Sequence, residues 1–80
     1  MKEINFYYRE QCQLCDEALD ILSILKNLYT FQIKMCNINL NEEWFERYHL
    51  EIPVLEAGNR RLLGNEISFQ QIESYIKSLN

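Results

Sequence analysis

Apolar residues alternate with polar ones near the start of the chain and then recur at helical spacing. Residues 4–8, Ile-Asn-Phe-Tyr-Tyr, have the alternation of a β-strand, and the bulk of Tyr7 indicates that both faces are covered. Beyond residue 13 the apolar positions lie three or four residues apart, which predicts an amphipathic helix over residues 13–28. Its expected buried stripe is Leu14, Ala18, Ile21, Leu22, Leu25 and Leu28.

The segment after this helix repeats the order of strand and helix with shorter elements. Residues 30–38 are predicted to form a second strand. Asn41 is a good N-cap for a short helix that ends near His49. The expected apolar face of that helix consists of Trp44, Phe45 and Tyr48.

The last part of the chain predicts a hairpin and a closing helix. The dipeptide Gly-Asn at positions 58–59 is a two-residue turn signal, so Val54–Glu56 and Arg61–Leu63 are expected to pair antiparallel. Ser68 followed by Gln71 fits a capping box at the start of the closing helix. The expected buried face of this helix consists of Phe69, Ile72, Ile76 and Leu79.

The complete order of elements, βαβαββα, predicts a fold of the α/β class. Strand, helix and strand follow one another within residues 4–38, which fits a βαβ unit with parallel strands and a right-handed crossover. No repeat or linker divides the chain, so we expect one domain over residues 1–80. Such a domain has helices on both faces of its sheet.

Composition narrows the classes of function. The apolar fraction of 48% and the charged fraction of 25% are those of a folded protein rather than a disordered one. The net charge is −4 without a basic cluster, which argues against nucleic-acid binding. No apolar run approaches the ~18 residues of a membrane span, and three cysteines are too few for a secreted disulfide framework. We therefore expect a cytoplasmic protein that binds neither nucleic acid nor membrane.

The strongest chemical signal is the pair Cys12 and Cys15, which stands where the first strand passes into the first helix. A C-x-x-C pair in that context can close a small disulfide, and a helix N-terminus favours the thiolate of the first cysteine. The sequence therefore predicts thiol–disulfide exchange, with Cys12 as the nucleophile and Cys15 as the resolving thiol. Tyr8 lies close to the pair in sequence and is a candidate for the lining of a substrate groove.

A metal site is the second class of chemistry to weigh. Cys12, Cys15, Cys36 and His49 are the residue types of a Cys₃His zinc set. The chain lacks a second closely spaced ligand pair, and Cys36 falls within a predicted strand, so no metal is expected. Cys36 is interpreted as a small buried hydrophobe and His49 as a residue at a helix end.

The chain resembles the thioredoxin superfamily, and among its members the small glutaredoxin-like proteins of bacteria. The resemblance covers the strand at residues 4–8, the cysteine pair with its helix, residues 52–55 (Ile-Pro-Val-Leu), the hairpin and the closing helix. It implies a thioredoxin-like fold with a four-stranded mixed sheet in the order 2-1-3-4 and three helices, the first and third on one face and the second on the other.

The resemblance also implies a substrate site. In the family the proline corresponding to Pro53 is cis and faces the cysteine pair, and the backbone groups around it bind a disulfide substrate as an extra strand. Ile52 and Pro53 are therefore expected to bind substrate, together with Gly64, which matches the first residue of the family's double glycine. A bridging iron–sulfur cluster is known among glutaredoxin relatives and is the alternative to a zinc site. Such a cluster usually needs glutathione.

The chain departs from the family pattern where relatives hold glutathione. Gln13 and Leu14 replace the proline and tyrosine common between the cysteines, and Glu51 stands where threonine is common. The double glycine is reduced to Gly64-Asn65, followed by Glu66. Because glutathione is an anion, Glu51 and Glu66 are expected to oppose its binding.

These observations together predict a monomeric thiol–disulfide oxidoreductase without a bound cofactor. Its expected substrates are protein or low-molecular-weight disulfides, with glutathione disfavoured as the reductant. The alternative is a non-enzymatic adaptor of the same fold, in which the pair Cys12 and Cys15 acts as a redox-sensitive switch for binding a protein partner.

Overall fold

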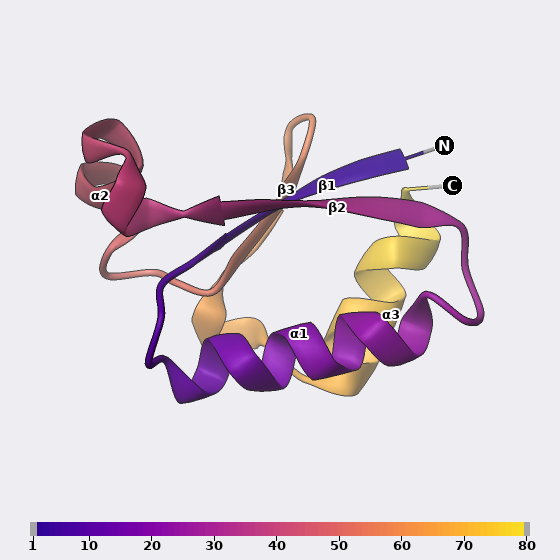
Figure 1. Cartoon of the computed structure of the whole chain (residues 1–80). Helices are drawn as coiled ribbons and strands as arrows, with labels where there is room; N and C mark the ends of the chain where they lie inside the picture. Colours follow the sequence, from indigo (N-terminus) through magenta and orange to yellow (C-terminus); the bar gives the residue numbers. More distant parts are fainter. Residues whose placement is uncertain (1, 80) are drawn as a thin grey trace.

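The computed structural model describes residues 2–79 and contains the predicted order βαβαββα, with two short 3₁₀ turns added (Figure 1). In chain order the elements are β1 (Lys2–Tyr8), α1 (Gln13–Leu25), β2 (Phe31–Asn37), η1 (Ile38–Leu40), α2 (Glu42–Tyr48), β3 (Val54–Ala57), β4 (Arg60–Leu62), η2 (Gly64–Glu66) and α3 (Phe69–Ser78). None of the helices within residues 2–79 is both long enough and apolar enough to cross a membrane.

The four strands form one mixed sheet in the order β2-β1-β3-β4, which is the order that the resemblance implies. β1 pairs parallel with β2 and antiparallel with β3, and β3 pairs antiparallel with β4. β1 therefore lies inside the sheet, with both of its edges used.

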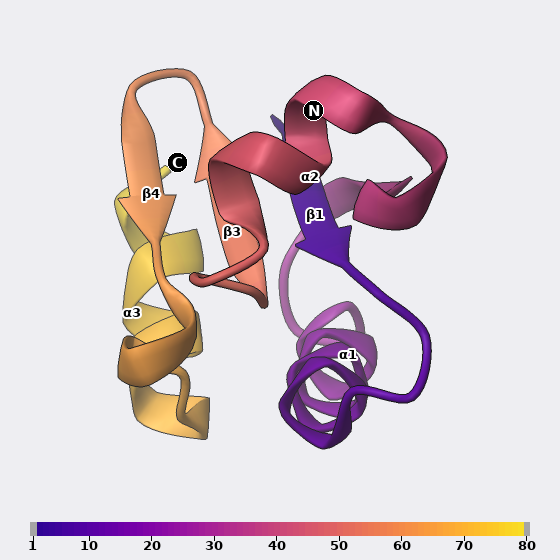
Figure 2. The same ribbon diagram turned by 90° about the vertical axis from the view of Figure 1, so that its left-hand side faces the viewer.

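The helices divide between the two faces of the sheet as expected. Figures 1 and 2 show α1 and α3 side by side on one face, and α2 on the other side at the end where α1 begins. The main core lies between the sheet and the α1/α3 layer, where Ile4 and Phe6 of β1 meet Leu22 and Ile72. A smaller far-face cluster consists of Tyr7, Cys36, Ile38, Tyr48 and Val54, with Trp44 packed against it.

The helix caps follow the sequence signals closely. The Asn41 side chain accepts a hydrogen bond from the backbone N–H of Trp44 at 3.1 Å and starts α2. The Ser68 hydroxyl accepts one from the N–H of Gln71 at 3.1 Å and starts α3. Each side chain satisfies one of the backbone donors that a helix start leaves without an internal partner.

The hairpin also forms where the dipeptide predicts it, with its strand limits shifted by one residue. Ala57 pairs with Arg60 across the turn, and Gly58 takes a φ of +62°. Glycine at the first central position with positive φ is the requirement of a type II′ turn. Tyr75 of α3, which the apolar pattern did not single out, is buried and donates its hydroxyl proton to the carbonyl of Arg60 at 2.9 Å.

The prediction for the first helix is wrong at its C-terminal end. α1 ends at Leu25, and the following N–H groups of Asn27 and Leu28 bond to carbonyls three residues back, at 3.1 and 2.9 Å. This tighter winding turns the chain toward β2 and leaves Leu28 65% exposed. At the other end Leu14 is 52% exposed, so only the middle of the predicted stripe is buried.

Two further apolar positions were predicted to be buried but lie at the surface. Phe45 on α2 is 43% exposed and stacks against His49, and Phe69 at the start of α3 is 42% exposed. Both lie on helices with narrow buried faces, since only Tyr48 of α2 and three residues of α3 are buried.

Two leucines of the predicted helix should respond differently to truncation. Leu22→Ala should lower the free energy of unfolding by about 2–5 kcal/mol, because the side chain is fully buried against the sheet. Leu28→Ala is the matched control and should change it by no more than about 0.5 kcal/mol. Urea unfolding followed by circular dichroism measures both, and a similar loss at the two positions would contradict the helix end at Leu25.

Candidate active site at the start of α1

The two cysteines of the C-x-x-C pair form a disulfide at the first turn of α1. Their Cα atoms are 5.2 Å apart. Cys12 is the N-cap residue, with extended backbone angles, and α1 begins at the next residue. The Sγ atom of Cys12 accepts a hydrogen bond from the N–H of Cys15 at 3.2 Å, and its carbonyl accepts one from the N–H of Asp16 at 3.0 Å. The sulfur of Cys12 therefore takes the place of a capping oxygen.

The two sulfur-bearing side chains differ in their access to solvent. Cys15 is only 2% exposed and belongs to the main core. Cys12 is partly exposed and packs at the edge of that core. Gln11, which precedes the pair, has a φ of +56°, so the chain makes a sharp turn between β1 and α1. This turn and the helix start place Cys12 outermost, so a partner approaching from solvent meets it first.

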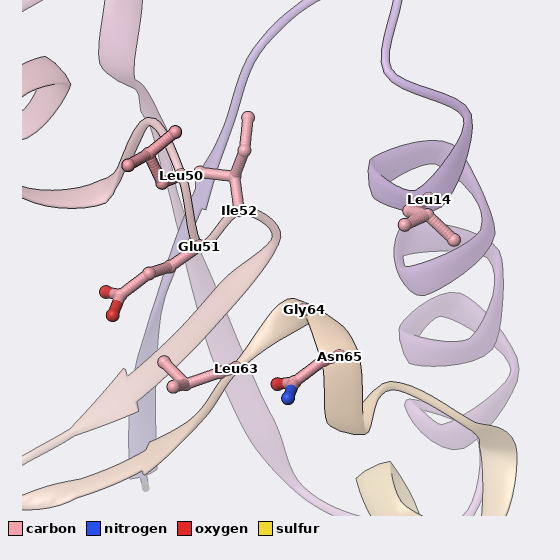
Figure 3. Close-up of a pocket in the computed structure, with 7 residues that line it drawn as sticks. All are labelled: Leu14, Leu50, Glu51, Ile52, Leu63, Gly64 and Asn65. Carbon is pink, nitrogen blue, oxygen red and sulfur yellow. The ribbon is translucent and has the colours of Figure 1, made fainter.

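A groove built from three separate segments reaches the pair at Leu14, the residue between Gln13 and Cys15. Figure 3 shows the three segments to be the first turn of α1, the loop before β3 and the segment after β4. The groove has a volume of about 460 Å³ and is lined by Leu14, Leu50, Glu51, Ile52, Leu63, Gly64 and Asn65. The peptide bond between Ile52 and Pro53 is cis, as the resemblance implies, and Pro53 is buried behind the groove wall.

The loop before β3 is held by its own backbone. The carbonyl of Tyr48 accepts hydrogen bonds from the N–H groups of Glu51 at 2.8 Å and Ile52 at 3.0 Å. The N–H of Gly64 donates to the carbonyl of Glu51 at 3.0 Å. The resemblance implies free backbone groups next to Pro53, but the N–H of Ile52 is already bound within the chain.

Gly64 is required by the close approach of two backbone segments. A Cβ atom at this position would lie 2.7 Å from the carbonyl oxygen of Ile52 and 2.8 Å from that of Glu51. Both distances are below van der Waals contact, and both partners are backbone atoms that cannot rotate away. The absence of a side chain at residue 64 therefore sets the distance between the two walls of the groove.

The far-face cluster anchors the same loop from the other side of the sheet. The ring of Tyr48 stacks on that of Tyr7 with centroids 4.1 Å apart. Both hydroxyls donate to the carboxylate of Glu56, at 3.4 and 3.2 Å, and the Nε of Arg61 donates to it at 3.0 Å. Burial, with smaller contributions from Tyr48 and Glu56, raises the pKa of Tyr7 well above its ordinary value, so its hydroxyl stays a donor.

The predicted site residues are not all gathered at the groove. Ile52 and Gly64 line it, and Pro53 lies behind Ile52. Tyr8 is not among the residues that line it, and its ring stacks on Phe6 with centroids 5.6 Å apart, so a role for Tyr8 in binding stays a prediction. Leu14, Leu50 and Leu63 also line the groove, and the sequence did not predict them as site residues. The one available signal was the apolar Leu14 between the two cysteines, which the helical pattern placed in the buried stripe.

The residues of the zinc set considered from sequence are not brought together. Cys36 is buried in the far-face cluster, on the opposite side of the sheet from Cys15, and burial raises the pKa of its thiol. The His49 Nδ1 atom lies 2.8 Å from the carbonyl oxygen of Phe45 in its own helix turn. Within residues 2–79 no three His, Cys, Asp or Glu side chains are grouped so that they could hold a metal ion.

A four-stranded mixed sheet with a C-x-x-C disulfide at the first helix start and a cis-proline before the third strand defines a protein of the thioredoxin superfamily. Comparison with known families is more specific. The family model described as "Glutaredoxin-like domain (DUF836)" matches residues 3–77. The chain therefore belongs to this glutaredoxin-like family.

A solved structure supports the fold independently. The chain described as "Structure of a malarial protein" superposes with a TM-score of 0.69 and 13% sequence identity. The match covers 95% of this chain and 93% of that one. At this level of identity the comparison shows a shared fold over almost the whole length.

Gly64 offers a direct test of the groove geometry. Gly64→Ala should lower the free energy of unfolding by about 1–3 kcal/mol, because the new methyl group overlaps two carbonyls and forces a backbone shift. Asn65→Ala is the neighbouring control, and since Asn65 is exposed it should change stability by less than about 0.5 kcal/mol. Equal stability of Gly64→Ala and the unmodified protein in chemical denaturation would show that the two segments are not in close contact.

Proposed function

We propose that this protein is a thiol–disulfide oxidoreductase that uses Cys12 and Cys15 as its dithiol–disulfide pair. The observation that carries the proposal is the unequal placement of the two sulfurs. Cys12 caps the helix and is partly exposed, and Cys15 is shielded one turn further on. Membership of the glutaredoxin-like family supports the same chemistry.

The proposed reaction begins with the reduced pair. The thiolate of Cys12 attacks one sulfur of a substrate disulfide, forms a mixed disulfide and releases the other substrate sulfur as a thiolate. Cys15, once deprotonated, attacks the Sγ of Cys12 and releases the second substrate thiol. Two electrons pass to the substrate and the pair ends as the disulfide present in this structure. An external thiol reductant then restores the dithiol.

The helix start favours Cys12 as the attacking group. The N–H of Cys15 points to the Sγ of Cys12, and the first turn of a helix carries donors without internal partners. Both effects stabilise a negative charge on that sulfur in the reduced state. Asp16 in the first turn acts in the opposite sense and limits the effect. Cys15 lies inside the helix, among apolar side chains, where a thiolate is less favourable.

The setting we propose is the cytoplasm, where the resting state of such a pair is the dithiol. We propose that the protein acts as a monomer, without a bound cofactor, on protein or low-molecular-weight disulfides. The three cysteines of the chain do not form a structural disulfide framework, since Cys36 is buried alone on the far face of the sheet.

The two cysteines should differ sharply when each is replaced by serine. Cys15→Ser should stop at a mixed disulfide that accumulates on Cys12, because the resolving thiol is absent. Cys12→Ser should neither react quickly nor trap substrate. Mass spectrometry after incubation with a model disulfide measures the adduct, and alkylation against pH should show Cys12 reacting at lower pH than a free cysteine.

The result also separates an enzyme from an adaptor of the same fold. An adaptor would bind its partner differently in the oxidised and reduced states without catalysing disulfide reduction. Faster alkylation of Cys15 than of Cys12, or no turnover of a model disulfide with a reducing system, would contradict the oxidoreductase.

The charge beside the groove should control the use of glutathione. Glu51→Lys should raise the rate with glutathione, and by more at low salt than at high salt, because the carboxylate repels an anionic ligand. Glu66, also expected to oppose glutathione, accepts the N–H of Leu63 at 3.2 Å, so its replacement would disturb η2 as well. Glu46 is an exposed residue of α2, away from the groove lining. Glu46→Lys makes the same charge change there and should give no comparable gain in the rate with glutathione.

A further inference from the structure

The groove beside Cys12 is apolar with a single charge. Four aliphatic side chains line it, from Leu14, Leu50, Ile52 and Leu63. Glu51 is the one charged residue among the seven that line it, and no cationic side chain is among them. Figure 3 shows its carboxylate on the side of the groove away from α1. A ligand in this groove therefore meets leucine side chains on both sides and the negative charge of Glu51 on the side away from α1.

Two of the leucines that line the groove have highly exposed side chains. Leu14 is 52% exposed and Leu50 is 87% exposed, and they come from opposite sides of the groove. Covering such side chains by an apolar partner is favourable, and an exposed apolar surface rimmed by polar groups marks interaction sites. The position of this surface beside Cys12 connects it with the disulfide that is exchanged.

Backbone pairing contributes less here than side chains do. The N–H of Ile52 is bound by Tyr48, and that of Gly64 is bound by Glu51. The carbonyl of Ile52 lies close against Gly64. A partner that enters the groove is therefore recognised mainly through apolar contact and charge.

Size does not select the ligand, but charge does. A volume of about 460 Å³ lies within the usual range of small-ligand sites, about 300–1,000 Å³, so glutathione is not excluded by space. Its negative charge faces Glu51 and a chain with a net charge of −4. Both features favour a cationic partner and disfavour an anionic one.

We infer that the groove selects protein disulfides in which the reacting cysteine has an apolar residue on one side and a basic residue on the other. This inference rests on the proposed oxidoreductase function and names its substrate class. The apolar side chain packs between Leu14 and Leu50, and the basic side chain lies near Glu51.

Three capped peptides provide the test. Each carries one cysteine in a mixed disulfide with 2-mercaptoethanol, within Leu-Cys-Lys, Ser-Cys-Lys or Leu-Cys-Glu. Each catalysed kcat/KM is divided by the rate of the same disulfide with dithiothreitol, because neighbouring charges also change intrinsic reactivity. We expect Leu-Cys-Lys to exceed Ser-Cys-Lys by about tenfold. It should exceed Leu-Cys-Glu by about threefold at low salt and by less at high salt.

Matched variants assign each preference to its residue. Leu50→Ser should remove most of the leucine preference, whereas Leu28→Ser, an exposed leucine of the same type after α1, should keep it. Glu51→Gln should remove the difference between the lysine and glutamate peptides, and Glu46→Gln on α2 should keep it.

The outcomes distinguish a failure of the proposed selectivity from a failure of the proposed oxidoreductase function. Equal normalised kcat/KM for the three peptides, with turnover of a small neutral disulfide intact, would overturn the selectivity and leave the oxidoreductase standing. An equal leucine preference in Leu50→Ser and Leu28→Ser would also overturn the selectivity and leave the oxidoreductase standing. If neither the peptides nor the neutral disulfide is turned over, both proposals fail.

Discussion

The burial of β1 on both faces is the constraint on which the site depends. Its two edges pair with β2 and β3, while Phe6 fills the main core and Tyr7 the far-face cluster. α1 must return across one of these faces after a short turn, so its first residues lie at the edge of the sheet where β1 ends. Open α/β sheets bind ligands at that edge. The position of Cys12 therefore follows from the packing of the strand before it.

Local features of the chain were predictable from sequence because their causes are local. The caps at Asn41 and Ser68 and the turn at residues 58–59 each depend on a few neighbouring residues. The strand order was obtained from the resemblance to a known family, since spacing along the chain does not say which strands become neighbours.

The errors have a common physical origin. Helical periodicity gives the direction in which a side chain points but not whether the sheet extends beneath it. Leu14, Leu22 and Leu28 belong to one stripe in the sequence pattern, yet Leu14 lies in the first turn of α1 and Leu28 lies beyond its last residue, and both are exposed. The groove was missed for a related reason: its walls come from three segments that meet only in the folded chain.

The cysteine pair and the groove depend on different parts of the molecule. The reactivity of Cys12 is a property of one helix start, whereas the groove beside it depends on how closely Gly64 approaches the loop before β3. Substitutions on the groove walls can therefore alter the shape of the groove while the capping bond at Cys12 remains in place.

Tyr48 extends this dependence to the far side of the sheet. Its carbonyl holds the N–H groups of Glu51 and Ile52, and its ring and hydroxyl are fixed by Tyr7 and Glu56. One wall of the groove is thus positioned by residues that no substrate touches. Changes in the aromatic packing between α2 and the sheet can therefore move this groove wall without any change at the two sulfurs, so the shape of the groove can vary while the cysteine pair stays the same.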